Sequence, residues 1–195
     1  SLVSEVEGLI ILKDLMKEGV LTLQYLDFSF IPDSLLRHKS LTNSVTKIRL
    51  NNCKLQKFPS FLLAYKNLVY LNLANNSIRS LPKEMEEFRA LEVCILSRNS
   101  FKTFPKSLSK VNKLHTLILD NCPTSAIDNS LSTCHALRVL SINNNQFKEI
   151  PLVLFKMSQL EILNIKRLYK FGRTPYREKT IDDLRSVLTT CSVTS

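Results

Sequence analysis

The segment LVYLNLANNSIRSLPKEMEEFRA, residues 68–90, recurs in degenerate copies along the chain. Segments with the same apolar pattern begin every 23 residues, at Val45, Leu68, Leu91, Leu114, Leu137 and Leu160. A fixed period of this length is typical of repeat architectures, in which each unit packs only on its neighbours. The period therefore predicts a solenoid, and it gives each residue a numbered position within a unit.

Each unit follows the pattern L-x-x-L-x-L-x-x-N-x-L-x-x-L-P-x-x-L-x-x-L-x-x. Apolar and variable residues alternate around the fourth to sixth positions, which predicts a short strand with one buried face. A buried Asn at the ninth position, where the chain leaves the strand, can bond backbone groups that would otherwise be unpaired. Cys is small enough to replace it, and the five units hold Cys53, Asn76, Asn99, Cys122 and Asn145 there.

A pair such as Leu81-Pro82 fills the fourteenth and fifteenth positions. Proline suits the start of a short helix, where its missing N–H is not needed. With this pair and its 23-residue length, the unit resembles the leucine-rich repeat, most closely the intracellular Ras-group class, over residues 45–165. The resemblance implies an α/β repeat solenoid, an arc with a parallel concave sheet and short helices or turns on its convex side. It also implies partner binding mostly on the concave sheet and its edges.

We expect the 195 residues to form a single leucine-rich-repeat domain with helical caps at both ends. Residues 1–22 are the predicted N-terminal cap, in which Gly19 would end an amphipathic helix. Its apolar face would carry Leu2, Val6, Leu9, Leu12 and Met16.

Residues 23–44 are predicted to be a degenerate first repeat, shortened at its turn, with strand residues at Leu23, Leu26 and Phe28. The regular repeats occupy residues 45–165, and residues 166–195 form the predicted C-terminal cap. Thr180 is a suitable N-cap for a helix in this cap. One face of that helix would carry Leu184, Val187, Leu188 and Cys191.

The fourth regular unit departs from the pattern. Thr124 stands where other units have an apolar residue, and Asp128 stands where the others have Pro. Two interpretations are open for this unit. The change either shapes a binding edge or is drift that the fold tolerates.

The cysteines bear on the compartment. None of the five forms a C-x-x-C pair, and Cys53, Cys94, Cys122 and Cys134 fall on core positions. Buried free thiols are ordinary in intracellular proteins and unusual in secreted ones. The first residues lack the basic start of a signal peptide, and no apolar run approaches 18 residues. We therefore predict a cytoplasmic protein with no membrane span, and the nucleus stays open.

The candidate binding residues are those that alternate with core positions on the strands, at the third and fifth positions of each unit. They are Lys47, Arg49, Tyr70, Asn72, Val93, Ile95, Thr116, Ile118, Val139, Ser141, Ile162 and Asn164, with Arg98 and Asp120 from the adjoining turns. An apolar centre with a polar rim is typical of a protein-binding surface, and Tyr70 and Arg98 are the expected anchors. The alternative is that β-propensity or a covering terminal segment accounts for the apolar centre.

Catalytic chemistry has little support in the sequence. The three histidines are His38, His115 and His135, and the repeat places no Ser or Cys beside them. Three glycines cannot build a phosphate-binding loop. We therefore predict no enzyme activity, no cofactor and no metal site.

These observations favour a non-catalytic protein–protein interaction module with another protein as its partner. The resemblance implies a scaffold, or the recognition domain of an intracellular signalling protein. A preformed concave surface would bind with little reorganisation.

Binding of nucleic acid or an acidic surface is the alternative, because the net charge is +10 and residues 166–179 are strongly basic. The candidate residues are Lys166, Arg167, Lys170, Arg173, Arg177 and Lys179. The apolar concave centre argues against it, since a phosphate track needs rows of Lys and Arg.

If the basic segment binds RNA or DNA, affinity will fall steeply as salt rises. Neutralising Lys170, Arg173 and Arg177 together will then abolish binding, because those charges release the counterions. Filter binding across a salt series measures both effects. If the affinity does not change with salt and the triple variant still binds, the nucleic-acid alternative is wrong.

Overall fold

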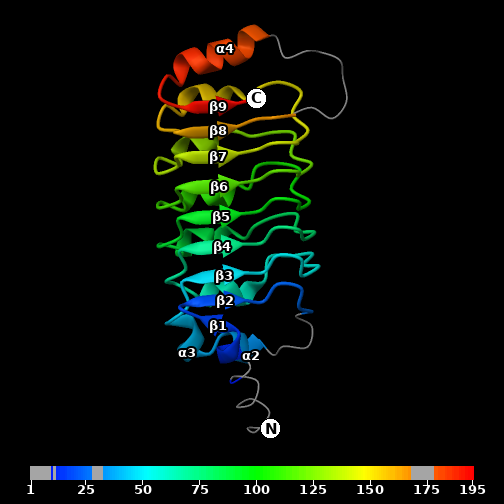
Figure 1. Cartoon of the computed structure of the whole chain (residues 1–195), viewed down its shortest axis with the longest axis vertical. Coiled ribbons are helices and arrows are strands. Elements are labelled where there is room, and N and C mark those ends of the chain that lie inside the picture. Colours follow the sequence, from blue (N-terminus) through cyan, green and yellow to red (C-terminus); the bar gives the residue numbers. More distant parts are fainter. Residues whose placement is uncertain (1–9, 11, 28–32, 168–177) are drawn as a thin grey trace.

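The computed structural model describes residues 10, 12–27, 33–167 and 178–195. One sheet of nine strands runs through them in chain order, stacked one above another (Figure 1). The strands are β1 (Met16–Lys17), β2 (Val20–Thr22), β3 (Lys47–Arg49), β4 (Tyr70–Asn72), β5 (Val93–Ile95), β6 (Thr116–Ile118), β7 (Val139–Ser141), β8 (Ile162–Asn164) and β9 (Ser192–Thr194). Only the β1–β2 pair is antiparallel among these, so the predicted parallel sheet is confirmed.

Short 3₁₀ helices cover the other side of the sheet, behind the strands in Figure 1. They are η2 (Ser60–Ala64), η3 (Lys83–Glu87), η4 (Lys106–Lys110), η5 (Asn129–Thr133) and η6 (Leu152–Lys156). Proline precedes four of them, as the repeat predicts, and Asp128 precedes η5. The Asp128 carboxylate accepts the Ser130 N–H at 3.0 Å, so it replaces the proline as a helix cap. The α-helices are α2 (Asp33–Leu36), α3 (Lys39–Thr42) and α4 (Glu178–Val187).

The core is continuous from the first unit to the last. At the centres of β4 to β8, Leu71, Cys94, Leu117, Leu140 and Leu163 align in register and are fully buried. Because a single unit cannot enclose its own apolar side, burial is completed by the neighbours above and below. Cys53, Cys94, Cys122 and Cys134 are buried free thiols, as their repeat positions predict.

A ladder of ninth-position side chains joins the turns between units. The Asn76 and Asn99 amides donate at 2.9 Å to the Leu50 and Leu73 carbonyls of the preceding units. Asn145 does the same to the Leu119 carbonyl at 2.9 Å. The thiols of Cys53 and Cys122 reach the Leu23 and Leu96 carbonyls at 3.1 and 3.6 Å. The prediction that Cys can replace Asn at the ninth position is therefore confirmed.

The first unit differs from the prediction. Leu21 pairs with Ile48, so its strand is Val20–Thr22, and the expected strand residues Leu23 and Leu26 lie after it. Phe28 lies outside the described residues. The interval from Leu21 to Ile48 is 27 residues, longer than the 23 between regular units. The first unit is therefore extended and not shortened.

The N-terminal cap ends in a hairpin instead of a helix that runs to Gly19. Residues 12–14 are helical, but β1 and β2 then pair across a turn at Glu18 and Gly19. Gly19 has φ +75, and a Cβ there would meet the Ser44 oxygen at 3.2 Å. Glycine is needed for this turn because other side chains rarely adopt that backbone conformation.

The C-terminal helix is confirmed as α4, and Leu184 and Leu188 are buried as predicted. The helix begins at Glu178, so Thr180 lies inside it and is not its N-cap. Val187 is 47% exposed, so its assignment to the buried face is wrong. Cys191 lies in the turn after α4, where the chain leads into β9. The sequence did not predict β9, which adds a further parallel strand beside β8.

We predict that Asn99→Ala lowers the free energy of unfolding by roughly 1–3 kcal/mol, because it leaves a buried backbone donor unpaired and removes hydrogen bonds to two buried carbonyls. The donor is the Ile78 N–H, and the carbonyls of Leu73 and Leu96 keep only their bonds from Asn76 and Cys122. Asn99→Cys should cost less, since a thiol already fills this position elsewhere. Urea denaturation measures both, with exposed Asn112→Ala as the control. Equal losses for Ala and Cys would show that hydrogen bonding is not the cause.

Candidate functional site

Strand register brings the two predicted columns onto one face. Lys47, Tyr70, Val93, Thr116, Val139 and Ile162 align as the third positions. The fifth positions Arg49, Asn72, Ile95, Ile118, Ser141 and Asn164 align beside them. Each residue alternates with a buried strand residue, so both columns belong to the side of the sheet opposite the core.

An apolar stripe runs along this face. We call it the concave stripe and define it as Tyr70, Val93, Ile95, Ile118, Val139 and Ile162. Five of these side chains are half-buried against their strand neighbours, while Ile162 is 41% exposed. The exposed cations Lys47 and Arg49 lie at one end of the stripe, on β3. The stripe thus offers apolar contact along several units with a basic end.

Ser141 is not available to a partner, although its column position predicts that it is. It is 3% exposed, and its hydroxyl donates to Asp120 Oδ1 at 2.7 Å. The same carboxylate oxygen accepts the Asn143 N–H at 2.8 Å. Asp120, Ser141 and Asn143 therefore bond one another and hold the turns of neighbouring units together.

His115 shows no catalytic arrangement among the residues that the structure describes. It is exposed, and its Nδ1 lies 3.2 Å from the Thr116 hydroxyl on the same strand. In the described part of the chain, no group of His, Cys, Asp or Glu is placed to hold a metal ion.

The turns after β3 to β8 each contain a left-handed residue at the eighth position of the unit. Its φ is 62 at Asn52, 55 at Asn75, Arg98 and Asn121, 53 at Asn144 and 49 at Arg167. Asn tolerates this conformation because its short side chain can bond locally, whereas Arg has no such compensation. Arg98 and Arg167 therefore hold a strained backbone that four units assign to Asn. Backbone strain of this kind gathers at functional positions.

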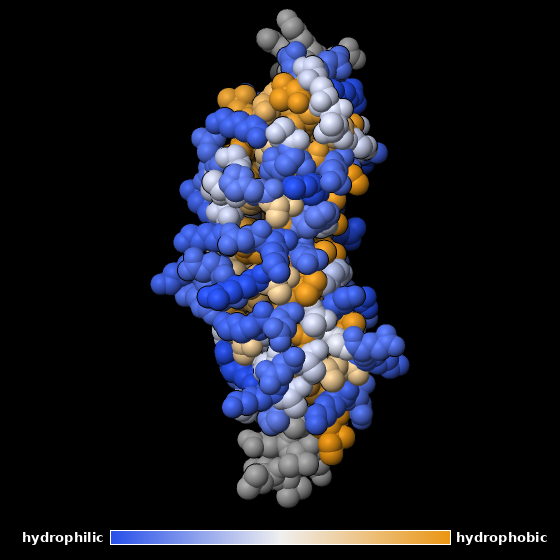
Figure 2. Space-filling view, turned by 90° about the vertical axis from the view of Figure 1, so that its left-hand side faces the viewer, coloured by the Kyte–Doolittle hydropathy of each residue, from blue (hydrophilic) through white to orange (hydrophobic). Residues whose placement is uncertain are grey.

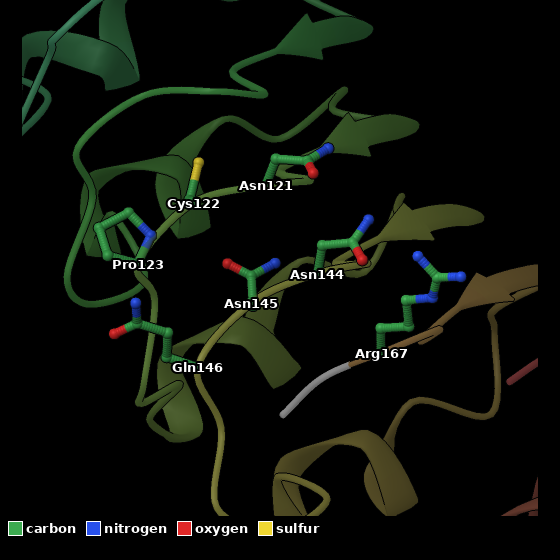
Figure 3. A pocket seen from close by; sticks show the side chains of 7 residues that line it. All are labelled: Asn121, Cys122, Pro123, Asn144, Asn145, Gln146 and Arg167. Carbon is green, nitrogen blue, oxygen red and sulfur yellow. The ribbon is translucent and has the colours of Figure 1, made fainter. Parts of the chain in front are cut away.

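A hollow opens at the turns of the fourth and fifth regular units. Figure 3 shows Cys122 and Pro123 on one side of it, Asn145 and Gln146 below, and Arg167 approaching from the next unit. The buried Asn145 Oδ1 has no hydrogen-bond partner among the described residues.

The matching oxygens of Asn76 and Asn99 accept N–H groups at the eleventh position of the preceding unit. Thr124 occupies that position before Asn145, and its hydroxyl donates to the Phe101 carbonyl at 2.9 Å. The Asn145 amide therefore keeps its ladder bond to the Leu119 carbonyl, but its oxygen lacks the N–H that the matching oxygens accept.

Comparison with known families adds to this geometry. A model of the leucine-rich repeat family matches residues 67–88, a stretch about one unit long. The chain is a leucine-rich-repeat solenoid. Comparison with curated proteins finds no match.

Solved structures share the solenoid. A leucine-rich-repeat protein of Leptospira interrogans is similar at 25% identity and TM-score 0.71, covering 87% of this chain and 41% of that one. The functional domain of InlJ from Listeria monocytogenes, which includes a cysteine ladder, is 18% identical with TM-score 0.56. That match covers 77% of this chain and 29% of the InlJ chain. An internalin (InlF) of the same species is 17% identical at TM-score 0.55, covering 82% of this chain and 49% of that one.

This solenoid spans less than half the length of each of these three chains. The Ras-group class is not tested by these likenesses and stays a prediction. Among the described residues, no helix is long and apolar enough to cross a membrane.

Of the predicted basic site, Lys166 and Arg167 are described and exposed. Lys170, Arg173 and Arg177 lie outside the described residues, and Lys179 belongs to α4. The left-handed arginines were missed by sequence reasoning, although the Asn that recurs at the eighth position is a usable signal for that conformation.

We predict that Arg98→Asn raises the free energy of unfolding by roughly 0.5–1 kcal/mol, because Asn relieves the left-handed strain. The reciprocal change Asn75→Arg should lower it by a similar amount. Chemical denaturation of both variants measures the effect. A loss of stability in Arg98→Asn would mean that the arginine side chain contributes contacts that outweigh its strain.

Proposed function

We propose that this solenoid is a non-catalytic protein-interaction module that binds its partner across the concave stripe. The observation that carries the proposal is the half-exposed apolar stripe from Tyr70 to Ile162, displayed on a rigid sheet. Leucine-rich-repeat solenoids typically use such extended concave surfaces for binding. A stripe with a polar rim matches the make-up of interface centres.

Rigidity favours this role. Within the described residues, seven parallel strand pairs and the ninth-position ladder hold the stripe before a partner arrives. A preformed surface loses little conformational entropy on binding, so more of the contact energy appears as affinity. Tyr70 and Arg98 keep their place as the proposed anchors, since Tyr and Arg dominate interface energetics.

The proposed setting is a scaffold or recognition domain of a cytoplasmic signalling protein. Four buried thiols support a reducing compartment. Burial raises the pKa of the Cys94 thiol to about 12 and the pKa of the Cys134 thiol to about 11. Both groups therefore stay protonated and unreactive at neutral pH.

We predict that Tyr70→Ala and Ile95→Lys each weaken partner capture at least tenfold while leaving the fold intact, because both remove exposed stripe contacts. Affinity capture from the native cell lysate, read by mass spectrometry, identifies the partner. Titration of that partner then gives the affinities, and circular dichroism reports the fold.

The matched control is Leu152→Lys, which changes an apolar side chain that is 76% exposed on η6, away from the stripe. It should leave affinity unchanged. If Leu152→Lys weakens capture as much as Ile95→Lys, the stripe is not the binding surface. If the stripe variants unfold, their side chains stabilise the fold and the proposal fails.

A further inference from the structure

Charge is distributed unevenly between the two lateral edges of the solenoid. The strand-end edge consists of the turns that follow the strands, and the strand-start edge consists of the loops that lead into them. In the first three regular units, the strand-end turns are residues 51–57, 74–80 and 97–103. They contain five basic residues and no acidic residue: Lys54, Lys57, Arg79, Arg98 and Lys102. We call these five the strand-end cations.

The strand-end cations are all exposed, and no carboxylate partner is found for any of them among the described residues. The corresponding turns of the next two units, residues 120–126 and 143–149, hold two acids and one base. Among the five regular units, the excess positive charge on this edge is therefore confined to the turns of the first three.

The strand-start edge is arranged differently. Ion pairs cross between units there: Lys66 with Glu87, Lys110 with Glu86 at 3.3 Å, and Arg138 with Glu161 at 3.8 Å. Figure 2 views the molecule from this side and shows hydrophilic side chains along most of its length. On this edge part of the positive charge pairs with carboxylates of neighbouring units, whereas no strand-end cation pairs with a described carboxylate.

The strand-end edge also has a shaped feature. Lys57 and Arg79 line a hollow between the first and second regular units. Phe58, Leu81 and Pro82 line the same hollow and are half-buried. The hollow thus combines apolar contact with two cations that pair with no described carboxylate, which suits an apolar side chain flanked by acids.

Arg98 adds an independent observation. It occupies the left-handed eighth position, where Asn would be more favourable. The charge of Arg98 therefore comes with a backbone cost that the Asn of four other units avoids.

We propose that the strand-end cations form a docking surface for an acidic segment of the protein partner, with an apolar side chain of that segment in the hollow. This inference rests on the proposed function, because the segment belongs to the partner that covers the adjacent concave stripe. Uncompensated charge of one sign steers a complementary partner and sets its orientation.

Acidic protein fits this surface better than nucleic acid does. Nucleic-acid binding to single strands relies on aromatic rings that stack on bases. Beside the strand-end cations, Phe101 and Phe104 are buried, and Phe58 packs edge-on against Phe88 at 6.3 Å. The cation row is also broken in the fourth unit, where Ser125 takes the place of Lys102.

The test compares two variants of equal charge. The first carries Lys57→Ser, Arg79→Ser and Lys102→Ser on the strand-end edge, and it leaves the proposed stripe anchor Arg98 unchanged. The second carries Arg89→Ser, Lys113→Asn and Lys156→Ser, which are exposed cations between the 3₁₀ helices and the following strands or at a helix end. Both triple variants lower the net charge by the same amount, and all six changed side chains are exposed, so neither variant removes core packing.

The probes are a fluorescent peptide of alternating Glu and Leu, the same peptide with Lys in place of Glu, and a mixed-sequence single-stranded DNA. Fluorescence anisotropy at about physiological ionic strength, where exposed charges are screened beyond about 8 Å, measures binding. We expect the acidic peptide to bind the wild type, to bind the strand-end variant at least tenfold more weakly, and to bind the control variant within twofold of the wild type. The basic peptide should not bind.

Three results would contradict the docking surface. They are no binding of the acidic peptide, an equal loss of peptide affinity in both triple variants, or DNA binding that is tighter than peptide binding and is weakened by the strand-end variant. Repeating the titrations with the captured partner separates this inference from the proposed function. If the affinity for the partner depends on Ile95 but not on the strand-end cations, only the docking surface is wrong. If the affinity for the partner depends on the cations but not on Tyr70 or Ile95, the concave stripe is not the binding surface.

Discussion

Every regular unit of this solenoid depends on the hydrogen bond from its ninth-position side chain to a carbonyl of the preceding unit. The turn that follows each strand leaves backbone groups inside the molecule, away from water, where an unpaired group costs roughly 1–3 kcal/mol. Asn76, Asn99 and Asn145 meet those groups with amides, and Cys53 and Cys122 meet them with thiols. Without that bond the turns could not be buried, and the strands could not stack in register.

Stacking in register then creates the surfaces. Because each strand lies directly beside the next, a residue type that recurs at one position becomes a continuous feature of the molecule. The buried strand positions become the core, and the alternate positions become the concave stripe. The turns of the first three regular units become an edge with unpaired cations, while part of the charge on the opposite edge pairs between units. In a solenoid, residues at the same position of successive units therefore lie side by side and form one continuous surface.

Much of the fold and of the candidate site could be predicted for this reason. The period places Tyr70 beside Val93 and buries Cys94 without any knowledge of long-range contacts. The period does not predict the two ends of the solenoid, where the repeat stops. The hairpin at Gly19 and the added strand β9 depend on contacts of segments that match no repeat. Ser141 shows a second limit, because its hydrogen bond to the Asp120 carboxylate of the preceding unit cannot be read from its own repeat position.

The sequence by itself determined the repeat, the core, the Asn and Cys ladder and the two columns of the concave face, because these follow from local spacing. Only the tertiary structure decided how the ends are capped and which polar groups bond each other. It also decided which cations lie within reach of a carboxylate, because pairing depends on the distance between side chains of different units. The left-handed arginines needed both kinds of information. The sequence shows Arg98 at a position where four other units have Asn, and the structure shows that this position has a left-handed backbone.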